Sequence, residues 1–159
     1  MGEAPAAAAL ADLTERPDFA ATVADRIWRN WWRAGGTSLA AVEARVADAV
    51  TAPGIPFCIV AYDAAGFAGT VSVIPQDLAD RAELTPWLAA LWVEEDRRDR
   101  GLGTRLLAAA TARAFALGAA RLYLCARPEL AEFYEARGWD ALEGGVGALG
   151  LMIFAREAR

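Results

Sequence analysis

Apolar residues recur along some stretches of this chain at helical spacing and form short runs in others. The alternation of these two patterns predicts the order of its helices and strands. Spacings of three and four residues predict a first helix from Pro17 to about Gly35. They predict a second helix from Ser38, whose hydroxyl can cap it, to residues 51–54. The alanine-rich residues 1–12 before them fit either an edge strand or a disordered arm. Two helices are therefore expected before the central strands.

Short apolar runs separated by turn residues predict two hairpins. Residues 57–62 and 67–74 flank Asp63-Ala64-Ala65-Gly66, which predicts an antiparallel pair with a short turn. Near the end of the chain, residues 139–142 and 148–154 flank the glycine-rich segment 143–147. We expect that segment to be the turn of the second hairpin.

Two further apolar runs predict a parallel pair of strands. Leu88–Val93 has few polar breaks, as in a strand covered on both faces, and residues 121–125 have the length and apolar content of a buried strand. A helical pattern joins them, so the two strands should run parallel. A last helix is expected from Pro128 to Gly138. The sum is one α/β (α+β) domain over residues 1–159, with a mixed, mostly antiparallel sheet and helices on both faces.

The segment after Val93 changes character abruptly. Residues 94–100 are too charged to bury, and Gly101-Leu102-Gly103 then gives the backbone freedom that lets main-chain N–H groups converge. A helix from about Gly103 to Gly118 follows; its expected inner stripe is Leu106, Leu107, Ala110, Ala114 and Leu117. A glycine-rich turn at a helix N-terminus favours phosphate or pyrophosphate, because unpaired N–H groups meet the positive end of the helix dipole.

Three kinds of phosphate-binding loop could account for this turn. A Walker loop needs a lysine, and the chain has none. A dinucleotide fingerprint needs a third small residue where Leu106 stands, so that interpretation is weak. The pattern that remains is Arg98-x-x-Gly101-x-Gly103. If this segment binds no ligand, it is simply a solvated charged loop that ends in glycines.

This pattern resembles the acetyl-CoA pyrophosphate loop of the GNAT superfamily of N-acetyltransferases, which reads [Arg/Gln]-x-x-Gly-x-[Gly/Ala]. The resemblance runs from about Asp18 to Phe154 and includes Pro86-Trp87-Leu88-Ala89, Leu122-Tyr123-Leu124 and Phe133-Tyr134-Glu135-x-x-Gly138-Trp139. It implies that acetyl-CoA is the co-substrate. The implied residues for binding it, by the backbone of the strand and by the turn, are Leu91, Trp92, Val93, Arg98, Asp99, Arg100, Gly101, Leu102, Gly103 and Thr104.

The catalytic residues are less clearly marked. The resemblance implies that Tyr134 protonates the departing CoA thiolate, since a phenol with a pKa near 10 keeps its proton at neutral pH. The alternative is that Tyr134 only packs against the sheet, with Leu130 and Phe133 on one helical face. The chain has no histidine to act as a base, so a carboxylate acting through water is expected. The candidates are Asp77, Asp80 and Glu83 in the connection 75–86 and Glu94 after the motif strand. Asp77 is preferred because it directly follows the strand that should neighbour Leu88–Val93.

Composition excludes several kinds of partner. The formal net charge is −5 and the charges are interspersed, so no nucleic-acid surface is expected. No apolar run approaches the roughly 20 residues of a membrane helix, and the first residues lack a basic start, so we expect a cytoplasmic protein without a membrane partner. Cys58 and Cys125 have no metal-ligand spacing, so no metal site is expected.

The sequence thus predicts an enzyme that transfers acetyl from acetyl-CoA to a primary amine of a small molecule by direct attack. Two alternatives stay open: a non-catalytic acyl-CoA sensor or interaction module with the same fold, and an unrelated nucleotide-binding module. Trp28, Trp31 and Trp32 on the first helix are interpreted as core packing, although the resemblance implies that this helix borders the acceptor pocket. The acceptor and the oligomeric state, a homodimer included, are left open.

Overall fold

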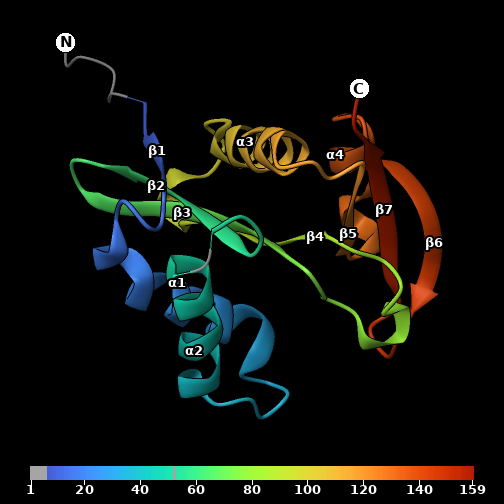
Figure 1. Ribbon diagram of the computed structural model, residues 1–159, viewed down its shortest axis with the longest axis horizontal. Coiled ribbons are helices and arrows are strands. Elements are labelled where there is room, and N and C mark those ends of the chain that lie inside the picture. Colours follow the sequence, from blue (N-terminus) through green and yellow to red (C-terminus); the bar gives the residue numbers. More distant parts are fainter. Residues whose placement is uncertain (1–6, 52) are drawn as a thin grey trace. The chain divides into compact units, whose positions relative to one another are not determined.

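The fold is a mixed, mostly antiparallel seven-stranded sheet with helices, described here from a computed structural model over residues 7–51 and 53–159. The strands lie in the order β1-β2-β3-β4-β5-β7-β6 (Figure 1). They are β1 (Ala9–Asp12), β2 (Phe57–Asp63), β3 (Gly66–Ile74), β4 (Trp87–Val93), β5 (Arg121–Ala126), β6 (Asp140–Val146) and β7 (Leu151–Glu157). The α-helices are α1 (Ala20–Ile27), α2 (Leu39–Thr51), α3 (Leu102–Ala116) and α4 (Ala131–Glu135). The predicted fold class is confirmed.

The described residues divide into two compact units. Unit 1 contains the residues up to Ser72 and residues 90–110, and unit 2 contains residues 73–89 and 111–159. The chain passes from one unit to the other within β3, β4 and α3. The expectation that residues 1–159 form one domain stays a prediction.

The first strand of unit 1 decides between an edge strand and a disordered arm where the structure describes the start of the chain. β1 pairs antiparallel with β2, from Ala9 opposite Tyr62 to Asp12 opposite Ile59. The Leu13 N–H then donates to the Cys58 carbonyl at 2.9 Å. The edge-strand interpretation is therefore right for residues 9–12, whereas residues 1–6 lie outside the described part of the chain.

Helices cover both faces of the sheet in unit 1. α1 and α2 lie on one face of β1–β3, and the start of α3 lies on the other (Figure 1). The predicted cap of α2 is confirmed, because the Ala41 N–H donates to Ser38 Oγ at 3.1 Å. The core on the α1–α2 side consists of Leu13, Val23, Ala24, Ile27, Val42, Val46, Ala49, Cys58 and Val60.

Core packing holds for two of the three tryptophans at the end of the first helical segment. α1 continues into a π-helical turn, Trp28–Trp32. Trp28 and Trp32 pack against the core of unit 1. Trp31 is 48% exposed and lies edge-on to Trp92, with ring centroids 6.4 Å apart, so the prediction was wrong for this residue. The π-turn adds a residue to the helical turn and so changes which side chains face inward.

Unit 2 is built around the parallel pair and the C-terminal strands. Trp87 of β4 lies opposite Tyr123 of β5, which confirms the predicted parallel pairing. β5 pairs antiparallel with β7, from Arg121 opposite Glu157 to Ala126 opposite Met152. One core cluster consists of Trp87, Tyr123, Val146, Ile153 and Ala155, with Ile74, Leu78, Leu84 and Cys125 packed against it.

Two boundaries differ from the prediction. In α3 the expected inner stripe is buried except for Leu117, which is 47% exposed because the helix ends at Ala116. In the C-terminal hairpin, β6 extends to Val146 and the turn spans residues 147–150. Residues 143–146 of the predicted turn therefore lie inside β6, an edge strand whose register against β7 shifts twice between Ala141 and Val146. Such irregular edges accommodate glycine within a strand.

Candidate active site

The turn between β4 and α3 has the backbone form that a convergent set of N–H groups needs. Asp99 and Gly101 both have positive φ, 63° and 76°. Aspartate tolerates this left-handed region better than most side chains, and glycine adopts it without strain. The Arg105 N–H donates to the Gly101 carbonyl at 3.1 Å, so Gly101 is the N-cap of α3. The N-terminus of α3, with its positive dipole end, therefore follows this turn directly.

The turn is anchored to the β2–β3 hairpin of unit 1. Arg97 donates to both carboxylate oxygens of Asp63, from Nη2 at 2.9 Å and from Nε at 3.2 Å. This guanidinium lowers the pKa of Asp63. The Glu94 N–H also donates to the Ala68 carbonyl at 2.9 Å. Arg97 thus has a structural role that the sequence did not reveal, since its partner lies 34 residues away.

Arg98, the first residue of the predicted motif, folds back over the end of β4. Its Nε donates to the Val93 carbonyl at 2.9 Å, and its guanidinium lies 4.6 Å from the centroid of the Trp92 ring. The side chain is therefore held by β4 in this structure while remaining largely in solvent. Its role in binding pyrophosphate stays a prediction.

β4 is irregular at its centre, and the expectation of a strand covered on both faces was wrong. Trp87 and Leu88 are buried, but residues 89–93 are only half-buried. Ala90 has a φ of 55°, a left-handed conformation that interrupts the pleat as at a β-bulge. The strand segment with the predicted binding residues Leu91, Trp92 and Val93 therefore begins directly after a break in regular strand geometry.

β3 carries the glycine that lets this irregular strand and α3 approach. A Cβ added to Gly69 would lie 2.7 Å from the Trp92 carbonyl oxygen and 3.1 Å from Leu106 Cδ1. Real Cβ atoms do not come that close to a backbone oxygen. Gly69 is thus part of the support of the turn, and nothing in the sequence alone distinguished it from the other glycines.

Tyr134, the predicted proton donor, is a buried residue of α4 in unit 2. Its ring packs against Phe133, Phe154 and Trp139, with centroids 5.1, 5.6 and 6.5 Å away. Burial, and secondarily Cys125, raise the pKa of Tyr134 to about 12. The predicted shared stripe was wrong for Leu130, which is 46% exposed, because Pro128–Leu130 form a 3₁₀ turn rather than α-helix.

Asp77, the predicted base, follows β3 in unit 2 and contacts a residue that the sequence did not suggest. The Cys125 thiol on β5 donates to Asp77 Oδ2 at 3.2 Å. Burial raises the pKa of the Asp77 carboxyl, and the thiol hydrogen bond partly opposes this shift. The pKa of the Cys125 thiol is raised by burial and by Asp77. The only sequence signal for Cys125 was its position two residues after Tyr123, on the same face of a strand.

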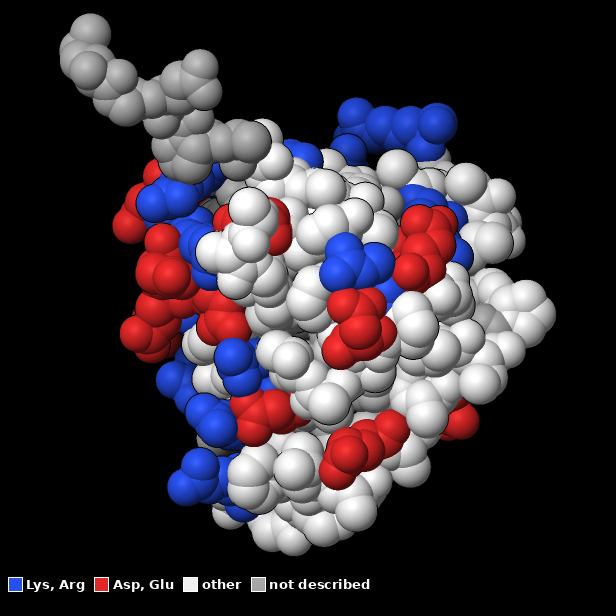
Figure 2. All heavy atoms as spheres, turned by 90° about the vertical axis from the view of Figure 1, so that its left-hand side faces the viewer, with Lys and Arg blue, Asp and Glu red and all other residues white. Residues whose placement is uncertain are grey.

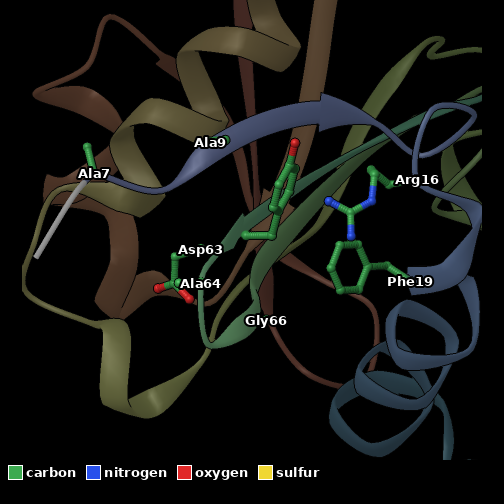
Figure 3. Close-up of a pocket in the computed structure, with 8 residues that line it drawn as sticks. Ala7, Ala9, Arg16, Phe19, Asp63, Ala64 and Gly66 are labelled. Atoms are coloured by element: carbon green, nitrogen blue, oxygen red, sulfur yellow. The ribbon is translucent and has the colours of Figure 1, made fainter.

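Clefts lie in the described part of unit 1. One, of about 600 Å³, is formed by the β2–β3 turn, β1 and the start of the first helical segment; the Arg16 guanidinium within it lies 4.4 and 4.2 Å from the ring centroids of Phe19 and Tyr62 (Figure 3). None of the predicted site residues lines it. The second, of about 440 Å³, includes Trp92 and Glu94, and the Arg26 Nε donates to Glu94 there at 2.8 Å.

The described residues carry mixed surface charge and neither a metal-binding cluster nor a membrane-spanning helix. Basic and acidic side chains are interleaved on the face that Figure 2 displays. Within residues 7–51 and 53–159, no three potential ligands of the His, Cys, Asp or Glu type gather in a way that could hold a metal ion. In the same residues, no helix has the length and apolar character needed to cross a membrane.

The sheet order and the glycine turn that leads from an irregular β4 into α3 are features that acyltransferases of one fold class share. The model of the acetyltransferase (GNAT) family matches residues 18–139, and the chain belongs to this family. No curated protein matches the sequence.

Solved structures of similar fold include acetyltransferases with known acceptors. An aminoglycoside 6'-acetyltransferase type Ii is 21% identical, with a TM-score of 0.70 over 94% of this chain and 96% of that one. An aminoglycoside 6'-N-acetyltransferase complexed with coenzyme A is 19% identical, with the same score and coverage. N-acetylglutamate synthase from Neisseria gonorrhoeae, complexed with coenzyme A and N-acetylglutamate, is 15% identical; the match has a TM-score of 0.65 and covers 98% of this chain and 36% of that one. At these identities the likeness concerns the fold.

Proposed function

We propose that this protein transfers the acetyl group of acetyl-CoA to a primary amine of a small molecule. The observation that carries the proposal is the backbone of the β4–α3 turn. Two left-handed residues, Asp99 and Gly101, lead directly into the N-terminus of a 15-residue helix. This arrangement can bind a pyrophosphate through main-chain N–H groups and the helix dipole.

In this proposal the pyrophosphate of acetyl-CoA binds to Arg98 and the backbone of residues 99–104. The pantetheine arm binds to the backbone of Leu91–Val93, for which the break at Ala90 provides support. Arg98 already presents its guanidinium above Trp92, at the start of the turn. Two acidic residues near the turn, Asp96 in the same segment and Asp63 in the β2–β3 hairpin, are paired with Arg97, which reduces their repulsion of an anion at the helix terminus.

The chemical step needs a base and an acid. The amine nitrogen attacks the thioester carbonyl carbon; a C–N bond forms and the C–S bond breaks. The nitrogen loses a proton through water to Asp77, and Tyr134 gives its phenolic proton to the leaving thiolate. The raised pKa of Asp77 suits a base, and the pKa of about 12 keeps Tyr134 protonated at neutral pH.

A screen of primary amines tests this function. Purified protein is mixed with acetyl-CoA and each amine, and free CoA thiol is measured against time, with binding of acetyl-CoA measured in parallel by calorimetry. The proposal expects amine-dependent thiol release for at least one small amine, with a matching acetylated product. Tight binding of acetyl-CoA without release by any amine would favour the acyl-CoA sensor instead. A cytoplasmic location and the oligomeric state stay predictions.

A further inference from the structure

The two cysteines of the chain have different surroundings, and Cys125 donates a hydrogen bond to a carboxylate, whereas Cys58 contacts a hydroxyl. Cys58 is buried in unit 1, with its Sγ 3.2 Å from the Thr70 hydroxyl. Cys125 is half-buried on β5, and its thiol donates to Asp77 Oδ2 at 3.2 Å although 48 residues separate them. A hydrogen bond between a thiol and a carboxylate that distant in sequence requires both elements to be held in place.

The segment around Asp77 is fixed on both sides of this residue. Gln76 Nε2 donates to the Ala82 carbonyl at 2.8 Å, and Leu78 packs against the core that contains Trp87 and Tyr123. Further along, Arg81 Nε donates to Glu143 Oε2 at 2.9 Å, which ties the same connection to β6. The carboxylate of Asp77 is therefore presented to β5 by a connection that is held by contacts before and after it.

The partner of Asp77 also differs from the partners of the other perturbed carboxyls. Asp18, Asp63 and Glu143 each accept hydrogen bonds from an arginine, which lowers the pKa of each carboxyl. Asp77 accepts from a neutral thiol, a weak donor, and its pKa is raised. Among the described residues, the titratable groups around it are Cys125 from β5 and, next to that thiol, Tyr134 from α4.

We propose that Cys125 is a positioning residue for Asp77: its thiol holds Oδ2, so that Oδ1 is directed to the water that takes the proton of the amine. This inference rests on the proposed function. An arginine or a backbone N–H in the same place would orient the carboxylate as well, but would remove most of its basicity. A thiol orients it at little cost in basicity. In the step itself the amine nitrogen loses one proton, Asp77 gains one, and Cys125 keeps its own.

The thiol stays a donor over the working pH range. Burial and the neighbouring Asp77 both raise the pKa of Cys125, so the S–H proton remains when Asp77 ionises. The same environment makes Cys125 a poor nucleophile, because the thiolate is the reactive form. Its place beside the base is thus suited to orientation rather than to covalent chemistry.

Two substitutions of Cys125 should shift the pH profile in opposite directions. The acid limb of kcat/KM is measured for the wild type, Cys125→Ala and Cys125→Ser, with Cys58→Ser as the control for loss of a thiol elsewhere. Cys125→Ala removes the donor, so the pKa of the acid limb should rise and kcat should fall about three- to tenfold. Cys125→Ser supplies a stronger donor, so the pKa should fall while kcat stays close to that of the wild type. The Cys58→Ser profile should match the wild type.

A second measurement separates this inference from the proposed function. Titration of the aspartate carboxyls by ¹³C NMR, with Asp77→Asn to assign the resonance, follows Asp77 without turnover. The inference expects the order Cys125→Ala above wild type above Cys125→Ser for the pKa of Asp77. An unchanged Asp77 titration in both variants overturns it, whether or not the protein acetylates amines. The expected shifts without any turnover would overturn the proposed function, and the role of Cys125 would then be confined to holding the Asp77 carboxylate.

Discussion

The β4–α3 turn and the Asp77–Cys125 pair assemble chemistry in different ways. The turn is made of backbone: positive φ at Asp99 and Gly101, followed by a helix N-terminus, all within a few consecutive residues. The pair is made of side chains brought together from residues 48 apart. Backbone sites follow from local sequence, whereas side-chain sites depend on how distant elements pack. The two regions therefore differ in what a single substitution can disturb.

The largest effect is expected at Tyr134, whose hydroxyl can be removed without altering the packing of its ring. Tyr134→Phe keeps the contacts with Phe133, Phe154 and Trp139. Its single-turnover rate should fall by roughly 10²- to 10⁴-fold, nearer the low end because a CoA thiolate is only modestly basic. Single-turnover kinetics is the right measurement, since slow product release can hide the loss in kcat.

The melting temperature and the affinity for acetyl-CoA are the controls for this variant, and both should stay near the wild-type values. An unchanged single-turnover rate would return Tyr134 to a packing role. A fall in rate accompanied by an equal loss of affinity would also count against proton donation, because the hydroxyl would then contribute to binding rather than to the chemical step.

A smaller effect is expected from a substitution that disturbs the close approach of β3 and β4 beneath the β4–α3 turn. Gly69→Ala places a Cβ 2.7 Å from the Trp92 carbonyl oxygen, so β3 and β4 must move apart. We expect a loss of about 1–3 kcal/mol in the free energy of unfolding, measured by urea denaturation. Gly103→Ala is the matched control: its Cβ would meet only Val93 Cγ2 at 3.8 Å, so its stability should equal or exceed that of the wild type. Equal stability of the two variants would refute the close approach at Gly69.

The smallest effect concerns the pH dependence of stability. The pKa of Asp77 is raised in the folded protein, so ionising this carboxyl costs folding free energy. That cost is absent below the ordinary aspartate pKa of about 3.9 and is complete once the pH exceeds the raised value. Asp77→Asn should therefore be more stable than the wild type near pH 8, with the difference shrinking toward pH 4 in urea denaturation curves.

Asp63→Asn provides a control of opposite sign. Arg97 lowers the pKa of Asp63, so the ionised carboxylate stabilises the fold above the ordinary aspartate pKa, and this contribution is lost as the pH falls through the lowered value. This variant should be less stable than the wild type near neutral pH. A stability difference for Asp77→Asn that is independent of pH would contradict the raised pKa.

Sequence reasoning succeeded where the information was local. The order of elements, the Ser38 cap and the parallel pairing of β4 with β5 followed from periodicity, capping chemistry and the helix between the strands. It failed where tertiary packing decides. The C-terminal turn was misplaced because Gly144 and Gly145 lie within an edge strand, where glycine is tolerated.

The candidate site likewise has parts that local sequence predicts and parts that depend on tertiary packing. The glycine turn was recognisable from six consecutive residues, and the structure shows its left-handed backbone. Cys125 was seen only as a free thiol, because no local pattern links it to Asp77. The partner of Arg97 and the need for Gly69 were equally invisible, since both depend on residues at least 23 positions away in the sequence.

The most direct test of the central claim is the affinity of wild type, Gly103→Ala and Gly103→Asp for acetyl-CoA and for S-acetylpantetheine, which lacks the pyrophosphate. A carboxylate at the N-terminus of α3 repels an anion there, so Gly103→Asp should lose about 100-fold in affinity for acetyl-CoA by calorimetry, about 2.7 kcal/mol. Its affinity for S-acetylpantetheine should be unchanged, and Gly103→Ala should bind both like the wild type. An undiminished affinity of folded Gly103→Asp for acetyl-CoA, or an equal loss for both ligands, would contradict the claim that this turn binds pyrophosphate.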